Sequence, residues 1–151
     1  MKKLTKIVAV VAVALLFSCS SDDGGSSTSS DKIVGKWKMV SSKENGVAQD
    51  LDACDLMERS DFKSNGILIA EDYDLENGEC VLQDPSEPGL TLETKWRKLG
   101  DNSYEMYFMI NGVENPMTLP FTTEFSNGNN TVTTTATEPD GDVVVSVMEK
   151  V

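Results

Sequence analysis

Residues 104–125 read YEMYFMINGVENPMTLPFTTEF, and this stretch decides the fold class. In its first half the side chains expected to face inward are Tyr104, Met106, Phe108 and Ile110. In its second half they are Met117, Leu119, Phe121, Thr123 and Phe125. Alternation with a period of two predicts half-buried β-strands, and the Asn111-Gly112 pair between the two runs is the strongest short signal for a β-hairpin.

The rest of the chain repeats this pattern, with turn residues about every ten to fifteen positions. Strand-like runs cover residues 33–39, 56–63, 67–73, 80–82, 90–97, 131–138 and 143–147. Because the connections from residue 90 onward are short, neighbouring strands in sequence are expected to be neighbours in the sheet. The sequence therefore predicts an all-β protein: an antiparallel up-and-down meander that closes into a barrel of about eight strands.

In the last strand, Val143, Val145 and Val147 are expected to face inward. This assignment puts four apolar side chains on the outer face, where they would form an exposed patch: Tyr107, Met109, Val144 and Met148.

The first 18 residues have the layout of a secretory signal peptide. Three lysines precede an apolar run of eleven residues over 7–17, about half of the roughly 20 residues that a spanning helix needs. Leu16-Phe17-Ser18-Cys19 resembles a bacterial lipobox, in which cleavage precedes a cysteine that is then acylated. We expect Cys19 to anchor the mature protein in the lipid bilayer; the other interpretation is an unmodified cysteine beyond an ordinary cleavage site.

Residues 19–31 are predicted to be the lipidated cysteine and a flexible tether. Positions 20–31 hold only Ser, Gly, Asp and Thr, which cannot bury enough apolar surface to fold. Ser20-Ser21-Asp22-Asp23 resembles the acidic signal that sends Bacteroidetes lipoproteins to the outer face of the outer membrane, although a plain spacer has the same composition. We expect an outer-membrane, lipid-anchored protein that faces the cell exterior, with one folded domain at 32–151.

The cysteines predict a disulfide. Once Cys19 carries lipid, Cys54 and Cys80 are the pair that remains of three, in an oxidising compartment. A metal site or a redox dithiol is the weaker alternative, because the chain has no histidine and no C-x-x-C motif.

The opening of the folded region, IVGKWKMVSSKENG at 33–46, resembles bacterial lipocalin-like domains found widely as Bacteroidetes lipoproteins. The matching features are Gly35-x-Trp37, Asn45-Gly46, the two cysteines, FKSNG at 62–66 and KWRKL at 95–99. The resemblance implies a lipocalin-like β-barrel in which the glycine permits close packing and the tryptophan plugs one end. Lipocalins also pack an arginine from near the last strand on that tryptophan; here the last strand offers Lys150.

Charge and residue types exclude several function classes. The chain has 13 basic and 25 acidic residues; without the signal lysines 10 basic residues remain, a net charge of −15, which disfavours nucleic acid as a partner. Without histidine there is no Ser-His or Cys-His pair, and no Gly-rich phosphate loop occurs. We expect no enzymatic activity, no catalytic residue, no metal and no cofactor.

Two functions remain. The first is binding of a small apolar or amphipathic ligand in a barrel cavity of at least roughly 300 Å³. The second is a filled barrel that acts as a structural or interaction subunit of an envelope assembly, with an unidentified protein partner. Glu58 is either a polar anchor for the ligand or turned outward by a strand start. The candidate ligand-lining residues are Trp37, Met39, Glu58, Phe62, Trp96, Tyr104, Met106, Phe108 and Phe121.

Overall fold

A computed structural model describes residues 31–83 and 90–151, so the signal segment, Cys19 and the tether up to residue 30 lie outside the described residues. Its strands are β1 (Gly35–Glu44), β2 (Val47–Ala48), β3 (Arg59–Phe62), β4 (Leu68–Glu71), β5 (Tyr73–Glu76), β6 (Glu79–Leu82), β7 (Leu92–Gly100), β8 (Ser103–Ile110), β9 (Val113–Ser126), β10 (Thr131–Thr137) and β11 (Val143–Lys150). Two 3-10 turns, η2 (Asp55–Met57) and η3 (Asn127–Asn129), complete the described part. Within these ranges no helix is long and apolar enough to cross a bilayer.

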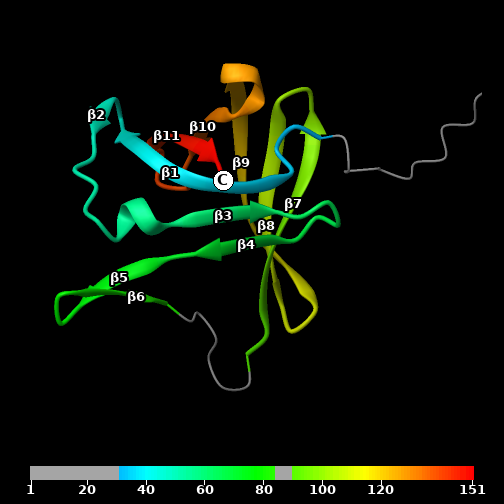
Figure 1. The fold of residues 1–151 in the computed structure, drawn as a ribbon. Helices are drawn as coiled ribbons and strands as arrows, with labels where there is room; N and C mark the ends of the chain where they lie inside the picture. Colours follow the sequence, from blue (N-terminus) through cyan, green and yellow to red (C-terminus); the bar gives the residue numbers. More distant parts are fainter. Residues whose placement is uncertain (1–30, 84–89) are drawn as a thin grey trace, which may run out of the picture.

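Nine strands form one antiparallel sheet, and eight of them follow one another around a nearly closed barrel (Figure 1). Their order is β4-β3-β1-β11-β10-β9-β8-β7, with β2 paired to β1. The two outer strands meet through a bridge between Ile67 and Lys95 and through the Trp96 N–H, which donates to the Gly66 carbonyl at 2.8 Å. The expected antiparallel up-and-down meander of about eight strands is confirmed.

The barrel has two different ends. At one end, here called the closed end, the beginning of β1, the Gly66 turn and η3 lie together with Lys150. At the other end, the mouth, lie the turns at Asn45-Gly46, Asn111-Gly112 and residues 138–142. Asn111 and Gly112 both adopt the positive φ angles, 50° and 77°, that a tight hairpin turn demands.

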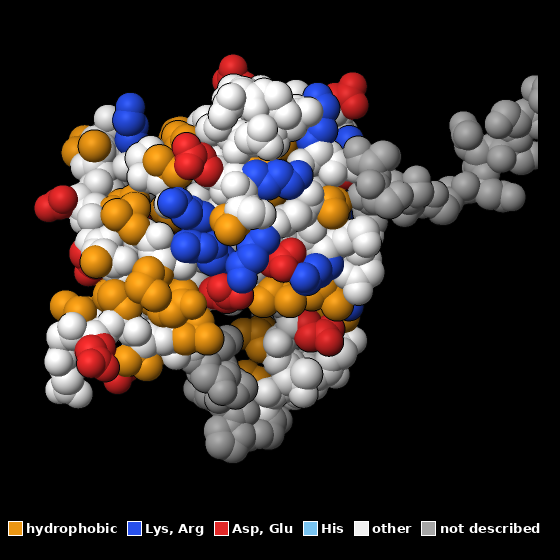
Figure 2. Space-filling model, in the orientation of Figure 1, with side chains coloured by type: hydrophobic (Ala, Val, Ile, Leu, Met, Phe, Trp, Pro, Cys, Tyr) orange, Lys and Arg blue, Asp and Glu red, His pale blue; other side chains and the backbone are white. Residues whose placement is uncertain are grey.

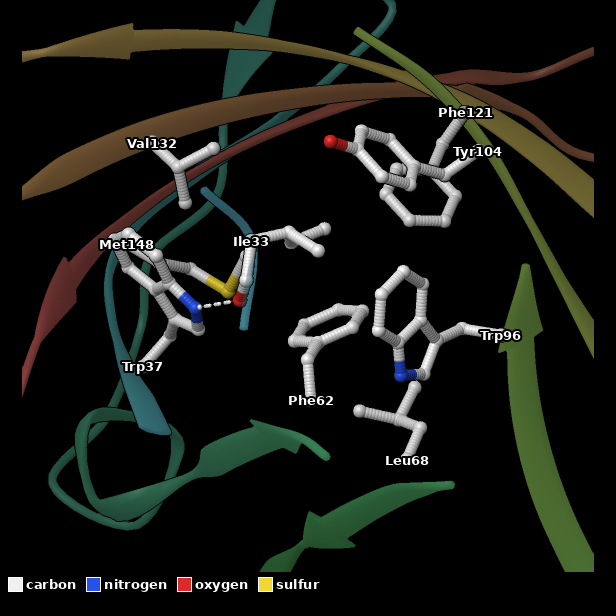
Figure 3. Close-up of a cluster of buried hydrophobic side chains, with 9 residues drawn as sticks. All are labelled: Ile33, Trp37, Phe62, Leu68, Trp96, Tyr104, Phe121, Val132 and Met148. Atoms are coloured by element: carbon white, nitrogen blue, oxygen red, sulfur yellow. Dashed lines mark hydrogen bonds between the residues drawn. The ribbon is translucent and has the colours of Figure 1, made fainter. Parts of the chain in front are cut away.

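A cluster of large buried side chains fills the closed end and is called the plug (Figure 3). Its members are Ile33, Trp37, Phe62, Leu68, Trp96, Tyr104, Phe121, Val132 and Met148. Edge-to-face and stacked ring contacts join the central aromatic residues, with ring centroids 5.5 Å apart for Tyr104 and Phe121 and 5.8 Å for Phe62 and Trp96. Such pairs add to the free energy gained by burying their area.

Trp37 is held from both sides at this end. Its indole Nε1 donates to the Ile33 carbonyl at 2.7 Å (Figure 3), and the ammonium of Lys150 lies 5.1 Å from its ring centroid. The Lys150 side chain passes directly over Gly35 to reach Trp37. A Cβ built on Gly35 would lie 2.7 Å from Lys150 Cε. Gly35 also has a φ of +137°, which side chains rarely adopt.

The short hairpin of β5 and β6 projects from the barrel (Figure 1) and is joined to it by a disulfide. Cys54, directly before η2, is bonded to Cys80 on β6, so the predicted pair is confirmed. The Cys54 side chain is buried, and Met57 N–H donates to its carbonyl at 2.8 Å.

Three local predictions were wrong. Residues 67–73 do not form one strand, because β4 ends at Glu71 and β5 begins at Tyr73. Leu56 lies in a 3-10 turn and is 42% exposed, not in a strand facing inward. Met117 is 60% exposed, because the pairing of β8 with β9 shifts register between Tyr107 and Met109, opposite this part of β9.

The face of β11 that points into the barrel is the opposite of the one expected. Met148 pairs with Met39 on β1 and with Val132 on β10, and it is buried in the plug. Val144 faces the same way as Met148, whereas Val143 is 37% exposed. The predicted outer patch of Tyr107, Met109, Val144 and Met148 is therefore wrong, since two of its four members lie inside.

Gly35→Ala should destabilise the fold by about 2 kcal/mol, because a side chain at this φ is strained and displaces Lys150 from Trp37. Urea unfolding followed by tryptophan fluorescence measures the change. Gly100→Ala is the matched control, since nothing lies within 4 Å of its added Cβ. Equal losses in the two variants would contradict this account.

Candidate functional site

A cavity of about 210 Å³, partly open to solvent, lies inside the barrel next to the plug. Its apolar lining consists of Met39, Phe62, Met106, Leu119, Phe121, Ala136, Val144 and Met148. Its polar lining consists of Ser60, Thr134, Ser146 and Glu138. The volume is below the roughly 300 Å³ at which typical ligand pockets begin.

The cavity exists because inward side chains become smaller toward the mouth. In β10 and β11 the facing pairs that line it are Thr134 with Ser146 and Ala136 with Val144. One step nearer the closed end, Val132 faces Met148 in the plug. Small residues that face one another near the mouth leave an empty space. At the closed end the large plug residues occupy the corresponding space.

Three methionines lie in the cavity wall: Met39 on β1, Met106 on β8 and Met148 on β11. Methionine is unbranched and has three rotatable bonds, so its thioether adapts to ligands of different shape. This part of the wall can therefore change its shape around a bound molecule.

The one charged group among the described lining residues is acidic, and a second carboxylate lies nearby. Glu138 lines it directly, just after β10. Glu58 ends the 3-10 turn before β3, and its carbonyl accepts from the Met39 N–H at 3.4 Å. Burial and the neighbouring carboxylates, Asp72 and Asp55 foremost, raise the pKa of Glu58 above its ordinary value.

The structure divides the nine sequence-based candidates into three groups. Met39, Phe62, Met106 and Phe121 line the cavity. Trp37, Trp96 and Tyr104 belong to the plug, and Phe62 and Phe121 belong to both. Glu58 and Phe108 are not among the described lining residues; both are half-buried.

Sequence reasoning missed several lining residues. The alternation in the sequence places Val144 and Met148 on the outer face and does not single out Glu138. The length of the loop between β10 and β11 is the signal that could have found them. Thr137 pairs with Val143, so Ala136 pairs with Val144. Because Thr134 and Ala136 face inward, Val144 faces inward as well. Because side chains alternate, one residue more or less in this loop reverses the face of the whole strand.

A second, polar depression of about 340 Å³ lies at the closed end. It is lined by Asp31, Lys32, Lys98, Asp101, Asn102 and Tyr104. Its central groups are already paired: Asp31 accepts from Tyr104 Oη at 2.6 Å, from Lys98 Nζ at 2.9 Å and from the Ile33 N–H at 3.1 Å. We infer that this cluster fixes the start of the domain to the barrel.

Hydrogen bonding at Asp31 controls its titration. Burial alone would raise the pKa of Asp31, but the hydrogen bonds from Tyr104 and Lys98 outweigh it and hold the pKa below its ordinary value. Burial, with the same Asp31 contact, raises the pKa of the Tyr104 phenol, so it stays protonated and donating.

No group of three or more potential ligating side chains in the described part of the chain is placed to hold a metal ion. In the same part every buried side-chain nitrogen or oxygen has a hydrogen-bond partner. No protein-family model matches the chain, and no curated protein matches it.

Asp31→Asn should lower the unfolding free energy at pH 7 by about 2 kcal/mol, because it removes a charged acceptor of three hydrogen bonds. The folded-state pKa lies below the ordinary value of 3.8, so the Asp31 contribution is complete above pH 3.8 and is lost as pH falls through the folded pKa. Urea unfolding of the wild type and variant at pH 7 and pH 3 tests this.

The control for Asp31→Asn is Asp101→Asn, an exposed residue in the same depression. Its unfolding free energy should match that of the wild type at pH 7. If Asp31→Asn and the wild type lost the same stability between pH 7 and pH 3, the assigned role of Asp31 would be wrong.

Proposed function

We propose that this protein is an outer-membrane lipoprotein of the bacterial lipocalin-like type that binds one small apolar or amphipathic ligand without converting it. The observation that carries the proposal is the cavity of about 210 Å³ with its largely apolar wall. Apolar walls with a few polar groups are what small-molecule sites in barrels present.

The volume limits the ligand. An apolar cavity of about 150 Å³ is known to hold benzene, whereas drug-sized molecules need roughly 300 Å³ or more. The ligand, or the part of it that enters the barrel, is therefore about the size of one aromatic ring or a short alkyl chain.

The closed end supports the lipocalin-like assignment. Trp37 plugs the barrel beside Gly35, as the resemblance implies. Lys150 on the last strand lies over the Trp37 ring, so a cation occupies the place where lipocalins carry an arginine.

The position of Asp31 supports an arrangement for the anchored protein. Asp31 is the first described residue and is bonded to the closed end. A lipid anchor at Cys19 would thus connect to the domain at the closed end, across the barrel from the mouth. Exposure on the outer face of the outer membrane is part of the proposal.

One observation favours a second candidate, an interaction subunit of an envelope assembly. Apolar side chains gather on the surface around η2 and the β5–β6 hairpin (Figure 2). They include Leu56, Met57, Leu75 and Leu82, each at least 41% exposed. Contiguous apolar patches of this kind often mark contacts with other proteins.

Filling the cavity should weaken ligand binding. We expect 2-phenylethanol to shift the ¹³C-methyl NMR signals of Met39, Met106 and Met148 in the full-length chain, and Thr134→Leu to weaken that binding at least about tenfold by occupying the space. Signals of the exposed Met57 and Met117 should not move.

The matched control is Thr135→Leu, the same change on the adjacent residue of β10. Thr135 pairs with Val145 and is not among the lining residues. The Thr135→Leu variant should therefore bind 2-phenylethanol with the same affinity as the wild type. An absence of shifts at the three cavity methyl groups at tens of millimolar probe would sink the binding function.

Lipidation is tested by Cys19→Ser in the native host. Labelled palmitate should enter the wild type and not the variant, and the variant should leave the membrane fraction, since acyl chains supply the membrane affinity. Protease added to intact cells should digest the wild-type domain. Label in the variant, or a domain that survives until the outer membrane is broken, would contradict the anchor or the surface location, respectively.

A further inference from the structure

The mouth of the barrel carries carboxylates on two sides of the cavity. On one side is the turn between β10 and β11, with Glu138, Asp140 and Asp142. Glu138 is itself a lining residue, and its N–H donates to the Asp142 carbonyl at 2.8 Å, which fixes the turn.

The other side is the group around Glu58. The carboxylates of Asp72, Asp55, Asp74 and Asp52 all act on Glu58. The carbonyl of Glu58 accepts from the N–H of Met39, a cavity residue, so Glu58 lies beside the cavity wall. Burial and these like charges raise the pKa of Glu58 above its ordinary value.

The described basic side chains near the mouth form no ion pair with these carboxylates. Arg59 donates through Nη1 to the carbonyls of Leu56 and Glu58, at 3.1 and 2.7 Å. Lys43 pairs with Val145, on the outer side of the barrel. The six ion pairs among the described residues involve neither Glu58 nor any carboxylate of the 138–142 turn.

At the closed end, by contrast, basic side chains are present and have partners. Lys98 is paired with Asp31, Lys63 with Asp61, and Lys150 lies on Trp37. Among the described lining residues of the cavity none is Lys or Arg. An anionic ligand would therefore meet repulsion at the mouth and no counter-charge inside, whereas a cation at the mouth would meet carboxylates.

We propose that the cavity selects cationic amphiphiles: molecules with one aromatic ring or a short alkyl chain and a protonated amine. The apolar body lies between the methionines, and the ammonium group remains at the mouth beside Glu138. The hydroxyl groups of Ser60, Thr134 and Ser146 are available to polar atoms along the body. This inference rests on the proposed binding function and specifies its ligand class.

The test is a matched series with one apolar body and three head groups: 2-phenylethylamine, 2-phenylethanol and 3-phenylpropionate. Each is titrated into the full-length chain at pH 7 and low salt, with the methyl signals of Met39, Met106 and Met148 as the readout. The amine should bind roughly tenfold more tightly than the alcohol, since several carboxylates act on it in a partly desolvated site. The propionate should bind more weakly than the alcohol. Raising sodium chloride to 0.5 M should reduce the advantage of the amine and leave the alcohol unchanged.

Glu138→Gln keeps the shape of the rim and removes its charge, so it should lower the affinity for the amine severalfold and leave that for the alcohol unchanged. Glu124→Gln is the control, because Glu124 pairs with Thr133 on β10 and is not among the lining residues. It should bind the amine as the wild type does.

The outcomes separate the two proposals. Equal affinities for amine and alcohol, or tighter binding of the propionate, would overturn the ligand class while the binding function stands. If none of the three compounds moved the cavity methyl signals, both proposals would be rejected. A preference for the amine that Glu138→Gln and Glu124→Gln reduce equally would overturn the role of Glu138.

Discussion

The barrel depends on the point where Trp96 joins its two outer strands. The Trp96 N–H donates to the Gly66 carbonyl at 2.8 Å, and its indole Nε1 donates to the Lys63 carbonyl at 3.0 Å. Gly66 has a φ of +81°, and a Cβ there would lie 3.3 Å from the Trp96 carbonyl oxygen, so the turn approaches β7 as closely as it does because it has no side chain. An open sheet would leave two unpaired edges, and this contact joins them at the closed end.

Closure at Trp96 also determines where space remains. The Trp96 ring lies against Phe62 and Tyr104, with centroids at 5.8 and 6.0 Å, so the large side chains collect at the end where the strands are joined. Toward the mouth the inward positions are held by Thr134, Ala136 and other small or flexible residues. The cavity thus follows from a gradient of side-chain volume along the barrel, from a filled end to a partly open one.

The sequence predicted those parts of the structure that depend on local chemistry. Strict alternation and the Asn111-Gly112 turn identified β8 and the start of β9, and counting cysteines identified the disulfide. It failed where several registers are compatible with the same residues: five of the first six residues in β11 are apolar, so alternation alone cannot tell its two faces apart. The inward face is chosen by pairing with β10 and β1, which is a long-range constraint. Glu138 was missed for the same reason, since its place at the rim follows from that pairing.

The two ends of the barrel shift the pKa of a carboxyl group in opposite directions. At the closed end Asp31 receives three hydrogen bonds, which hold its pKa below the ordinary value and make its charge part of what stabilises the fold. At the mouth, burial and the surrounding like charges raise the pKa of Glu58, so here the folded state works against ionisation. Packing does not require this repulsion, because these carboxylates lie outside the plug. A cation bound at the mouth would be attracted by these carboxylates and by Glu138, a contribution to binding that a neutral ligand of the same shape cannot obtain.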